Sequence, residues 1–339
     1  MTDAQEIAHW NAADLEPVLR CPACGGTPGT PRYAGLEDRL EGVPGRWAMR
    51  QCAQCRSLLL DPRPTPASIG KAYASYYTHR PGAAAYEQDN GKSVFWALAN
   101  DYMNDRFGSA RTPSTALGRW LLPLAFPLRQ QLDFFYRHLP RTPARLLDVG
   151  CGNGVFLLRA KAAGWSVTGL EPDPAAAAGV RRCGVEVHGG TLDSFRSSEP
   201  FDVATASHVI EHVHDPKAFL QHIFGLLRDG GSIWLATPNV ESIGHRVFGR
   251  AWRGLEPPRH LTVFSARAVR GLLQSAGFCD IRFRRRGRGA GYILEASRQL
   301  AASRKVTPRR LPTLLVDLLA SCSATAGEEL VVTARKPWR

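Results

Sequence analysis

The sequence predicts an α/β protein with a mostly parallel sheet, preceded by a small cysteine-rich module and a helical segment. From Arg145 onward, short apolar runs alternate with helical patterns, which is typical of a parallel sheet covered by helices on both faces. Two C-x2-C pairs lie in the first 60 residues, and a glycine-rich turn follows the first apolar run of the alternating part. We therefore expect three parts, residues 1–60, 61–140 and 141–339.

The composition is that of a soluble globular protein that can bury a substantial core, with 44% hydrophobic and 22% charged residues among 339. The 43 basic and 30 acidic residues give a net charge of +13. Ten of the basic residues lie between Ile281 and Arg310, with Glu295 as the single acid. This basic run predicts either an anionic partner, such as nucleic acid, phospholipid or phosphorylated sugar, or a solvated rim.

The chain shows no sign of a targeting or membrane-spanning segment. Its N-terminus, "MTDAQEIAHW", lacks the basic start and apolar stretch of a signal peptide. The most apolar window, "WLLPLAFPL" from Trp120, contains two prolines and is about half as long as a spanning helix. We expect it to touch a membrane surface at most, and we expect a cytoplasmic location.

The first part contains "CPAC" and "CAQC", two C-x2-C pairs separated by 27 residues. Two such knuckles can supply four thiolates to Zn²⁺ in tetrahedral geometry, and no position is then left for water, so the zinc would be structural. Disulfides are not expected without a secretion signal. The alternative is a set of reduced thiols or a redox pair. The predicted metal ligands of this zinc ribbon are Cys21, Cys24, Cys52 and Cys55.

The second part is rich in proline and aromatic residues, as in "DPRPTP" and "YASYY", and it has helical stretches. We interpret it, together with the ribbon, as a lid that faces the substrate. The candidates to close over a bound ligand are Tyr73, Tyr76, Tyr77 and His79. Ordinary aromatic packing between the flanking parts is the alternative.

The third part begins with five strand candidates, "RLLDV", "SVTGL", "VEVHG", "FDVATAS" and "SIWLAT", and "CDIRFRRR" and "ELVVTARK" add two more. The turn after the first reads D-x-G-x-G-x-G from Asp148 to Gly154. A dinucleotide fingerprint would need glycine where Val155 stands, and no Gly-Lys-Ser/Thr of a P-loop follows. The turn therefore lets a different ligand approach the backbone closely.

Two carboxylates accompany this turn. Glu171 ends the second strand 23 residues after Asp148, which is the spacing at which α/β folds place a carboxylate on a ribose diol. Both acids would lie at the carboxyl ends of the strands, where open parallel sheets bind their ligands. Asp148 can accept from a ligand cation or amine. This combination predicts a positively charged nucleoside, and S-adenosylmethionine fits.

At this point the sequence resembles the class I S-adenosylmethionine-dependent methyltransferases. "LLDVGCGNG" and "GLEPD" are similar to their first and second motifs. "FDVATASHVIEHVHDP" and "LLRDGGSIWLATPN" are similar to their fourth strand and to the turn and strand after it. The resemblance covers 145–336 and implies a Rossmann-like seven-stranded sheet. The residues that it places at the donor are Asp148, Gly150, Cys151, Gly152, Asn153, Gly154, Glu171, Pro172, Thr191, Leu192, Ser207 and His208, with Asp193 as a further candidate near the adenine.

A histidine-rich segment, "SHVIEHVHDP", follows the fourth strand. A single helical turn would put His208, Glu211 and His212 on one face, and His260 follows the fifth strand in a loop that could fold back. The segment resembles that of ubiquinone-type O-methyltransferases and small-RNA 2′-O-methyltransferases, in which Glu-x-x-Glu-His and a later His bind a metal. Here His208 replaces the first Glu, so these four residues are candidates for a second divalent metal, with Zn or Mn preferred over Mg. If a base is needed, we expect His260 first and His212 second.

These observations favour a methyltransferase that acts on a hydroxyl or acidic carbon of a small molecule, sugar or glycan, or natural-product intermediate. Similar ribbons precede the methyltransferase domains of deoxysugar C-methyltransferases. The first alternative is an RNA 2′-O-methyltransferase or another nucleic-acid methyltransferase, which the net charge supports. The second is a non-enzymatic module that binds the donor or uses the zinc ribbon for interactions. The acceptor cannot be identified from these residues.

Overall fold

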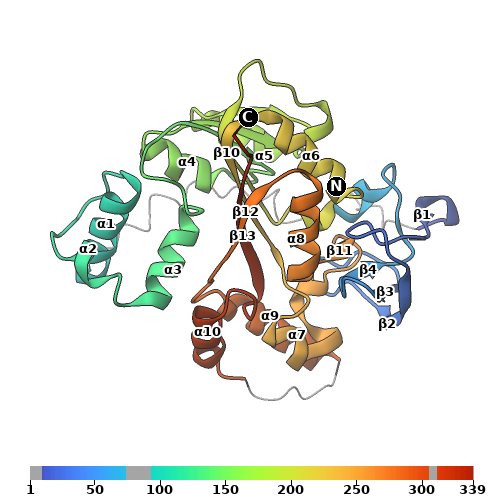
Figure 1. The fold of residues 1–339 in the computed structure, drawn as a ribbon. Coiled ribbons are helices and arrows are strands. Elements are labelled where there is room, and N and C mark those ends of the chain that lie inside the picture. The colour runs from blue at the N-terminus through green and yellow to red at the C-terminus, as the bar shows by residue number, and fades with distance from the viewer. Residues whose placement is uncertain (1–9, 74–92, 305–310, 339) are drawn as a thin grey trace, which may run out of the picture.

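The computed structural model describes residues 10–73, 93–304 and 311–338 (Figure 1). A seven-stranded sheet runs through the centre of the molecule, and a four-stranded sheet built largely from N-terminal residues lies beside it. Of the predicted lid residues, Tyr76, Tyr77 and His79 lie outside the described residues.

The central sheet has the strand order β12-β13-β10-β9-β6-β7-β8. The five strands from β10 to β8 are parallel, whereas β13 runs antiparallel to both of its neighbours. All seven predicted strands are present, so the predicted mostly parallel sheet is confirmed. Their bounds are β6 Arg145–Val149, β7 Ser166–Glu171, β8 Glu186–Gly189, β9 Phe201–Ser207, β10 Leu227–Pro238, β12 Cys279–Arg284 and β13 Glu329–Arg335.

Helices cover both faces of this sheet because successive strand residues point to opposite sides. Leu147 packs with α6 and α8, whereas Leu146 packs with α4, α5 and the helices α1 and α3 from the second part. Asp173 and Asp215 each cap a helix that begins with proline, accepting from Ala175 N and Ala218 N. The bounds are α4 Val155–Ala162, α5 Pro174–Arg182, α6 Pro216–Leu226 and α8 Ala266–Ser275.

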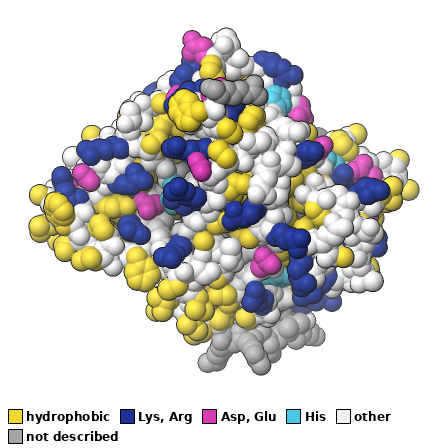
Figure 2. Space-filling model, in the orientation of Figure 1, with side chains coloured by type: hydrophobic (Ala, Val, Ile, Leu, Met, Phe, Trp, Pro, Cys, Tyr) yellow, Lys and Arg dark blue, Asp and Glu magenta, His cyan; other side chains and the backbone are white. Residues whose placement is uncertain are grey.

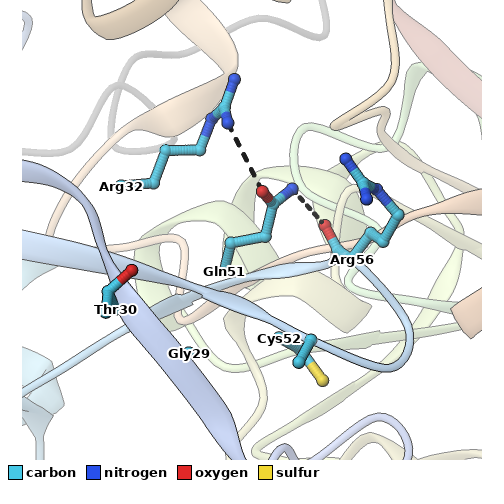
Figure 3. A pocket seen from close by; sticks show the side chains of 7 residues that line it. Gly29, Thr30, Arg32, Gln51, Cys52 and Arg56 are labelled. Atoms are coloured by element: carbon cyan, nitrogen blue, oxygen red, sulfur yellow. Dashed lines mark hydrogen bonds between the residues drawn. The ribbon is translucent and has the colours of Figure 1, made fainter.

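The second sheet has the order β11-β4-β3-β2 and contains both cysteine pairs at its turns. Three of its strands come from the N-terminal part, β2 Pro28–Leu36, β3 Trp47–Cys52 and β4 Leu58–Leu60. The fourth strand, β11 Thr262–Val263, lies about 200 residues later in the sequence and pairs with β4. A pocket of about 250 Å³ opens on this sheet beside the second cysteine pair (Figure 3). Strand β11, which follows β10 of the central sheet along the chain and pairs with β4, connects the two sheets.

The remaining elements are helices and short pairings at the periphery. Strand β1 Leu15–Glu16 pairs with β5 Arg63–Pro64. The α-helices are α1 Val94–Phe107, α2 Gly118–Leu121, α3 Phe126–Phe135, α7 Ile243–Phe248, α9 Ala290–Ser303 and α10 Thr313–Cys322. The 3-10 turns are η1 Ala12–Asp14, η2 Ile69–Tyr73, η5 Leu192–Ser194, η6 Ile210–His212, η7 Gly249–Ala251 and η8 Arg253–Leu255. The predicted boundaries between the three parts stay a prediction.

The most apolar window of the sequence lies at the surface, on α2 and the start of α3. Trp120 and Leu124 are more than 70% exposed, and Leu314 on the neighbouring helix α10 is also exposed. Figure 2 shows hydrophobic side chains gathered over this edge of the molecule. In the described part of the chain, none of the helices has the length and apolar character needed to cross a membrane.

The basic run from Ile281 to Arg310 divides into paired and exposed residues. Arg286 pairs with Glu329 at 3.2 Å, and Arg298 pairs with Glu295 at 3.0 Å. The exposed arginines of its described part include Arg282, Arg285 and Arg288. Part of the run therefore supports the fold, and the expected anionic partner stays a prediction.

A buried cation links the ribbon to the loop that precedes β11. Arg259 is fully buried and pairs with Asp38 at 2.7 Å and with Glu256 at 2.9 Å. Asp38 belongs to the ribbon, and its carboxylate also accepts from the backbone N–H groups of Leu40 and Val43. Because a buried charge without its partner is very costly, this pair fixes the ribbon against the loop.

We expect Asp38→Ala to lower the free energy of unfolding by about 3 kcal/mol, because the buried Arg259 guanidinium would lose its 2.7 Å carboxylate partner in the ribbon. The matched control is Glu37→Ala, which removes a surface carboxylate that pairs with Arg39 and should lower the free energy of unfolding far less. Denaturant unfolding measures both variants. Equal losses in the two variants would show that the buried pair does not join the ribbon to the loop.

Candidate functional site

The glycine turn between β6 and α4 has three glycines with positive φ. Gly150, Gly152 and Gly154 have φ values of 68°, 53° and 74°. A Cβ at Gly150 would lie 2.6 Å from Val209, and one at Gly154 would lie 2.6 Å from Val180. A Cβ at Gly152 would meet nothing within 4 Å. Two of the glycines are therefore required by packing, whereas Gly152 borders open space that a ligand can approach.

Glu171 closes this turn from the end of β7. Its carboxylate accepts from Gly152 N–H at 2.7 Å and from Asp173 N–H at 3.0 Å. Burial raises the pKa of this carboxyl despite the two hydrogen bonds. The two bonds fix the orientation of the carboxylate beside the open space at Gly152. This geometry fits the predicted contact between Glu171 and a ribose diol, which stays a prediction.

Asp148 is fully buried, and its partners come from the chain itself. One carboxylate oxygen pairs with Arg137 and accepts from Thr205 Oγ1 at 2.9 Å. The other oxygen, Oδ2, is buried and has no hydrogen-bond partner among the residues that the structure describes. The guanidinium of Arg137 lies 3.9 Å from the centre of the Phe156 ring. Burial raises the pKa of Asp148, although Arg137 and Thr205 act in the opposite direction.

The sequence contained no signal for Arg137, which lies outside every recognised motif. The guanidinium of Arg137 is therefore already a cationic partner of the Asp148 carboxylate. Oδ2 is the atom that the expected ligand cation or amine would satisfy. The open space at Gly152 and the oriented Glu171 carboxylate fit the nucleoside part of S-adenosylmethionine.

The structure brings the remaining donor candidates to the same edge of the sheet. Cys151 and Asn153 lie in the glycine turn, and Pro172 follows β7. Thr191 precedes the turn η5, in which Leu192 is buried and Asp193 is exposed, and Ser207 ends β9. All of them follow the carboxyl ends of the parallel strands β6 to β9, as expected for a ligand site of this topology. Their contacts to a donor stay predictions.

His208 lies between two carboxylates. Its Nε2 is 2.6 Å from Glu329 at the start of β13, and its Nδ1 is 3.2 Å from Glu211. Burial alone would lower the pKa of His208, but the two carboxylates raise it to about 10. His208 is therefore a cation at neutral pH. Glu329 was not a candidate from the sequence, because only the antiparallel return of β13 brings it here.

A second cluster contains Glu211, His212 and His260. One ligand atom from each of the three lies within 4.8 Å of the others, and the two imidazole centres are 4.8 Å apart. Glu211 also accepts from Thr237 Oγ1 at 2.9 Å. His208 is not in this group. Of the four residues predicted to bind a second metal, three converge, and the fourth, His208, bridges Glu211 and Glu329.

Backbone carbonyls orient both imidazoles of this cluster. His260 Nδ1 lies 2.9 Å from Gly254 O, and His212 Nδ1 lies 3.0 Å from Arg259 O, so each Nδ1 carries its proton when the ring is neutral. The Nε2 atoms are then the ones that can accept a proton or bind a cation, and Nε2 of His260 lies 3.6 Å from Glu256 Oε2. Burial lowers the pKa of His260 to about 4, even though Glu256 opposes this shift. Tyr73 reaches the same cluster, 2.9 Å from His212 Nδ1.

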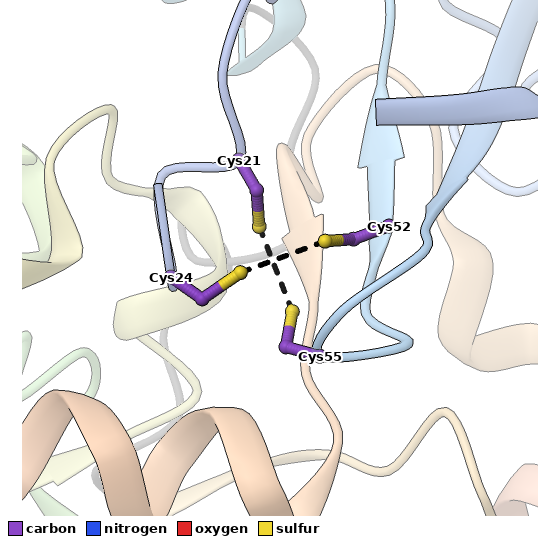
Figure 4. A group of neighbouring side chains, drawn as sticks. All are labelled: Cys21, Cys24, Cys52 and Cys55. Carbon is purple, nitrogen blue, oxygen red and sulfur yellow. Dashed lines mark hydrogen bonds between the residues drawn. The ribbon is translucent and has the colours of Figure 1, made fainter. Parts of the chain in front are cut away.

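The four ribbon cysteines form a compact tetrad (Figure 4). Cys21 Sγ lies 3.6 Å from Cys55 Sγ, and Cys24 Sγ lies 3.5 Å from Cys52 Sγ, with all four atoms within 4.8 Å of one another. Zn–S bonds of about 2.3 Å in a tetrahedron require S···S distances of about 3.8 Å, so the set fits a four-cysteine zinc site. Four thiolates leave no open position, as expected for a structural ion.

The second knuckle of the ribbon contacts the histidine cluster through the protein backbone. Ser265 Oγ donates to Cys55 O at 2.5 Å and caps α8, while Leu60 N–H donates to Leu261 O at 3.0 Å. Leu261 N–H in turn donates to Glu211 O at 2.8 Å. The segment that carries His260 is therefore held between the ribbon and the turn that carries Glu211.

The part of the chain that contains the five parallel strands is similar to a known protein family. Residues 125–282 match a family described as "Methyltransferase domain". The chain is 35% identical over 125 residues to the ubiquinone biosynthesis O-methyltransferase of Methylobacterium nodulans, covering 32% of this chain and 49% of that protein. It is 33% identical over 122 residues to the enzyme of that name from Aromatoleum aromaticum, covering 33% and 51%. The chain thus spans about half the length of these curated relatives.

Solved structures of S-adenosylmethionine-dependent methyltransferases are similar as well. One, from Mesorhizobium loti, is 18% identical with a TM-score of 0.43, covering 61% of this chain and 98% of that chain. Another, described as a possible histamine N-methyltransferase from Thermotoga maritima, is 20% identical with a TM-score of 0.42, covering 65% and 94%.

We expect Glu171→Ala to weaken S-adenosylmethionine binding by about 10- to 100-fold, since hydrogen bonds to a charged group contribute about 1.5–3 kcal/mol. The control is Glu186→Ala, which removes an exposed carboxylate on the neighbouring strand β8. Calorimetric titration measures both affinities. Binding of unchanged affinity by Glu171→Ala would remove this residue from the donor site.

We expect elemental analysis of the purified chain to find about one zinc per molecule. Cys52→Ser should lose this zinc and unfold at a lower temperature, because the tetrad would lack one of its four ligands. Cys183→Ser and Cys322→Ser alter exposed cysteines outside the tetrad and should retain zinc. A zinc content that is the same in Cys52→Ser and in these controls would rule out the four-cysteine site.

Proposed function

We propose that this chain, which contains a class I S-adenosylmethionine-dependent methyltransferase domain, transfers a methyl group to a hydroxyl or acidic carbon of a small molecule, sugar or glycan, or natural-product intermediate. The observation that carries the proposal is the oriented Glu171 carboxylate beside the open face of Gly152, at the same sheet edge as a pair of oriented imidazoles. The names of the curated relatives, which are O-methyltransferases, support an oxygen acceptor.

On the donor side of the reaction, the chain has to position the ligand and does not have to activate it. S-adenosylmethionine supplies an already activated methyl group, so the chain needs no nucleophile of its own. In our proposal, Glu171 accepts from the ribose hydroxyls, the Gly152 backbone allows close approach, and Asp148 Oδ2 faces the positive end. Thr191 and Leu192 border the adenine. Holding the two reacting groups in line accounts for much of the rate.

The acceptor half requires a group that removes a proton. His260 is neutral at pH 7 because burial keeps its pKa low, and its Nδ1–H is committed to Gly254 O. Its Nε2 is therefore the atom that accepts the acceptor's proton in our proposal. His212, with its Nδ1 at Arg259 O, is the second candidate. Both Glu211 and His260 are buried, which favours a single protruding hydroxyl over an extended nucleic-acid backbone.

The same three side chains could instead bind a divalent cation. Two imidazoles and one carboxylate suit Zn or Mn better than Mg, as the sequence predicts for a site with histidine ligands. A cation would occupy the Nε2 lone pairs, so the base role and the metal role exclude each other at each histidine. Metal content separates the two, because the ribbon alone gives about one ion per chain and a second occupied site gives two.

We expect His260→Ala to lower the rate of methyl transfer by about 10²- to 10⁴-fold without changing donor affinity. A transfer that uses neutral His260 should be constant from pH 6 to 8 and fall as pH falls through about 4, where the imidazole becomes protonated. His214→Ala is the matched control, because His214 bonds Pro64 O outside the cluster.

The assay is transfer of a tritiated methyl group to hydroxylated small molecules, glycosylated compounds and RNA in parallel. Label in the small-molecule or glycan fractions supports the proposal. Label in RNA alone would contradict it and favour the nucleic-acid alternative. An active His260→Ala variant would contradict the assigned base.

A further inference from the structure

The outer part of the zinc ribbon carries a pocket that the methyl-transfer site does not use. The pocket has a volume of about 250 Å³, which is below the range of drug-sized sites and suits a small group. Gly29 and Thr30 border it from β2, Gln51 from β3, and Arg56 from the second knuckle. The side chains of Arg32 and Arg56 lie on either side of Gln51 (Figure 3). None of the residues that line it is acidic.

The two guanidinium groups of this pocket have no carboxylate partner within the described ranges of the chain. Arg32 donates only a 3.4 Å hydrogen bond to Gln51 Oε1, and Arg56 makes its contact through its backbone carbonyl, which accepts from Gln51 Nε2 at 3.0 Å. Arg50 on the neighbouring strand β3, by contrast, is neutralised by Asp61 at 2.9 Å. The pocket therefore has two guanidinium groups without a carboxylate partner among the described residues, and the Cys52 thiolate that also lines it is committed to the predicted zinc site.

A comparison of the two zinc knuckles shows that Arg56 stands where the fold prefers glycine. The knuckles share one hydrogen-bond pattern, in which Gly25 N–H donates to Cys21 O at 2.8 Å and Arg56 N–H donates to Cys52 O at 3.0 Å. Gly25 has φ 74° and Arg56 has φ 65°. A left-handed conformation strains a residue that has a Cβ, whereas glycine adopts it freely. The second knuckle thus holds an arginine at an energetic cost that the turn itself does not require.

We propose that this pocket binds a phosphate or diphosphate group. Planar guanidinium groups donate paired hydrogen bonds that match phosphate oxygens, and two of them suit a dianion better than one. The Thr30 hydroxyl and the Gln51 amide border the same space as further donors. The site is distinct from the donor turn at the ends of β6 and β7, and it does not depend on the proposed methyl transfer. The phosphate belongs to a free ion or to the diphosphate of a larger ligand.

Calorimetric titration of the zinc-loaded full chain at low salt tests the proposal, with inorganic phosphate, inorganic pyrophosphate and a nucleoside diphosphate as separate probes. We expect binding that weakens with added salt and that Arg56→Gly and Arg32→Gln each reduce at least tenfold. Arg56→Gly should keep its zinc and its thermal stability, because glycine adopts the required φ without strain. A nucleoside diphosphate that binds tighter than pyrophosphate identifies the larger ligand as the source.

The control is Arg46→Gln, which removes a highly exposed arginine near Glu37, outside the pocket, and should leave binding unchanged. Failure of the wild-type chain to bind pyrophosphate would overturn the proposal. Equal pyrophosphate affinity in the wild type and in Arg56→Gly would also overturn it. Arg32→Gln provides the same test from the other side of the pocket, independently of the knuckle turn.

Discussion

The backbone of Leu261 is the point on which the arrangement of this molecule depends. Its carbonyl accepts from Leu60 of the ribbon, and its N–H donates to Glu211 O in the turn after β9. The residue before it is His260, and the residues after it form β11, the fourth strand of the ribbon sheet. One extended segment thus completes the zinc ribbon and places an imidazole in the candidate site. The ribbon is in this sense part of the site and not an appended module.

Burial determines the charges around this segment. Arg259 is neutralised by Asp38 and Glu256, so the ribbon contributes a carboxylate to the interior next to the histidines. Burial opposes ionisation of Glu256, yet the guanidinium groups of Arg253 and Arg259 hold its pKa below the usual range. On the other side of Glu211, His208 is kept protonated by two carboxylates. The neutral His260 and the cationic His208 therefore differ through their surroundings and not through their residue type.

Local patterns predicted most of the fold, and the donor candidates that they named lie at one edge of the central sheet. Alternating apolar runs identified all seven strands, and C-x2-C spacing identified the tetrad, because these signals lie within short segments. The pairing of Arg137 with Asp148, of Glu329 with His208 and of β11 with β4 could not be predicted, since each depends on tertiary packing between segments that no motif connects. The one-turn interpretation of 208–212 correctly placed His208 beside Glu211, but His208 does not join His212 and His260 in the three-residue group. A positive φ of 56° at His208 turns the chain before η6.

Because the segment that carries His260 also forms a strand of the ribbon sheet, we expect zinc binding by the ribbon to organise the histidine cluster. NMR of imidazole-labelled protein, comparing the wild type with a zinc-free Cys24→Ser variant, tests it most directly, with S-adenosylhomocysteine affinity measured on both samples to show that the central sheet remains folded. We expect the signals of His260 and His212 to shift or broaden in the variant, while the affinity for S-adenosylhomocysteine stays within about threefold. Unchanged histidine signals in a zinc-free, ligand-binding protein would contradict it.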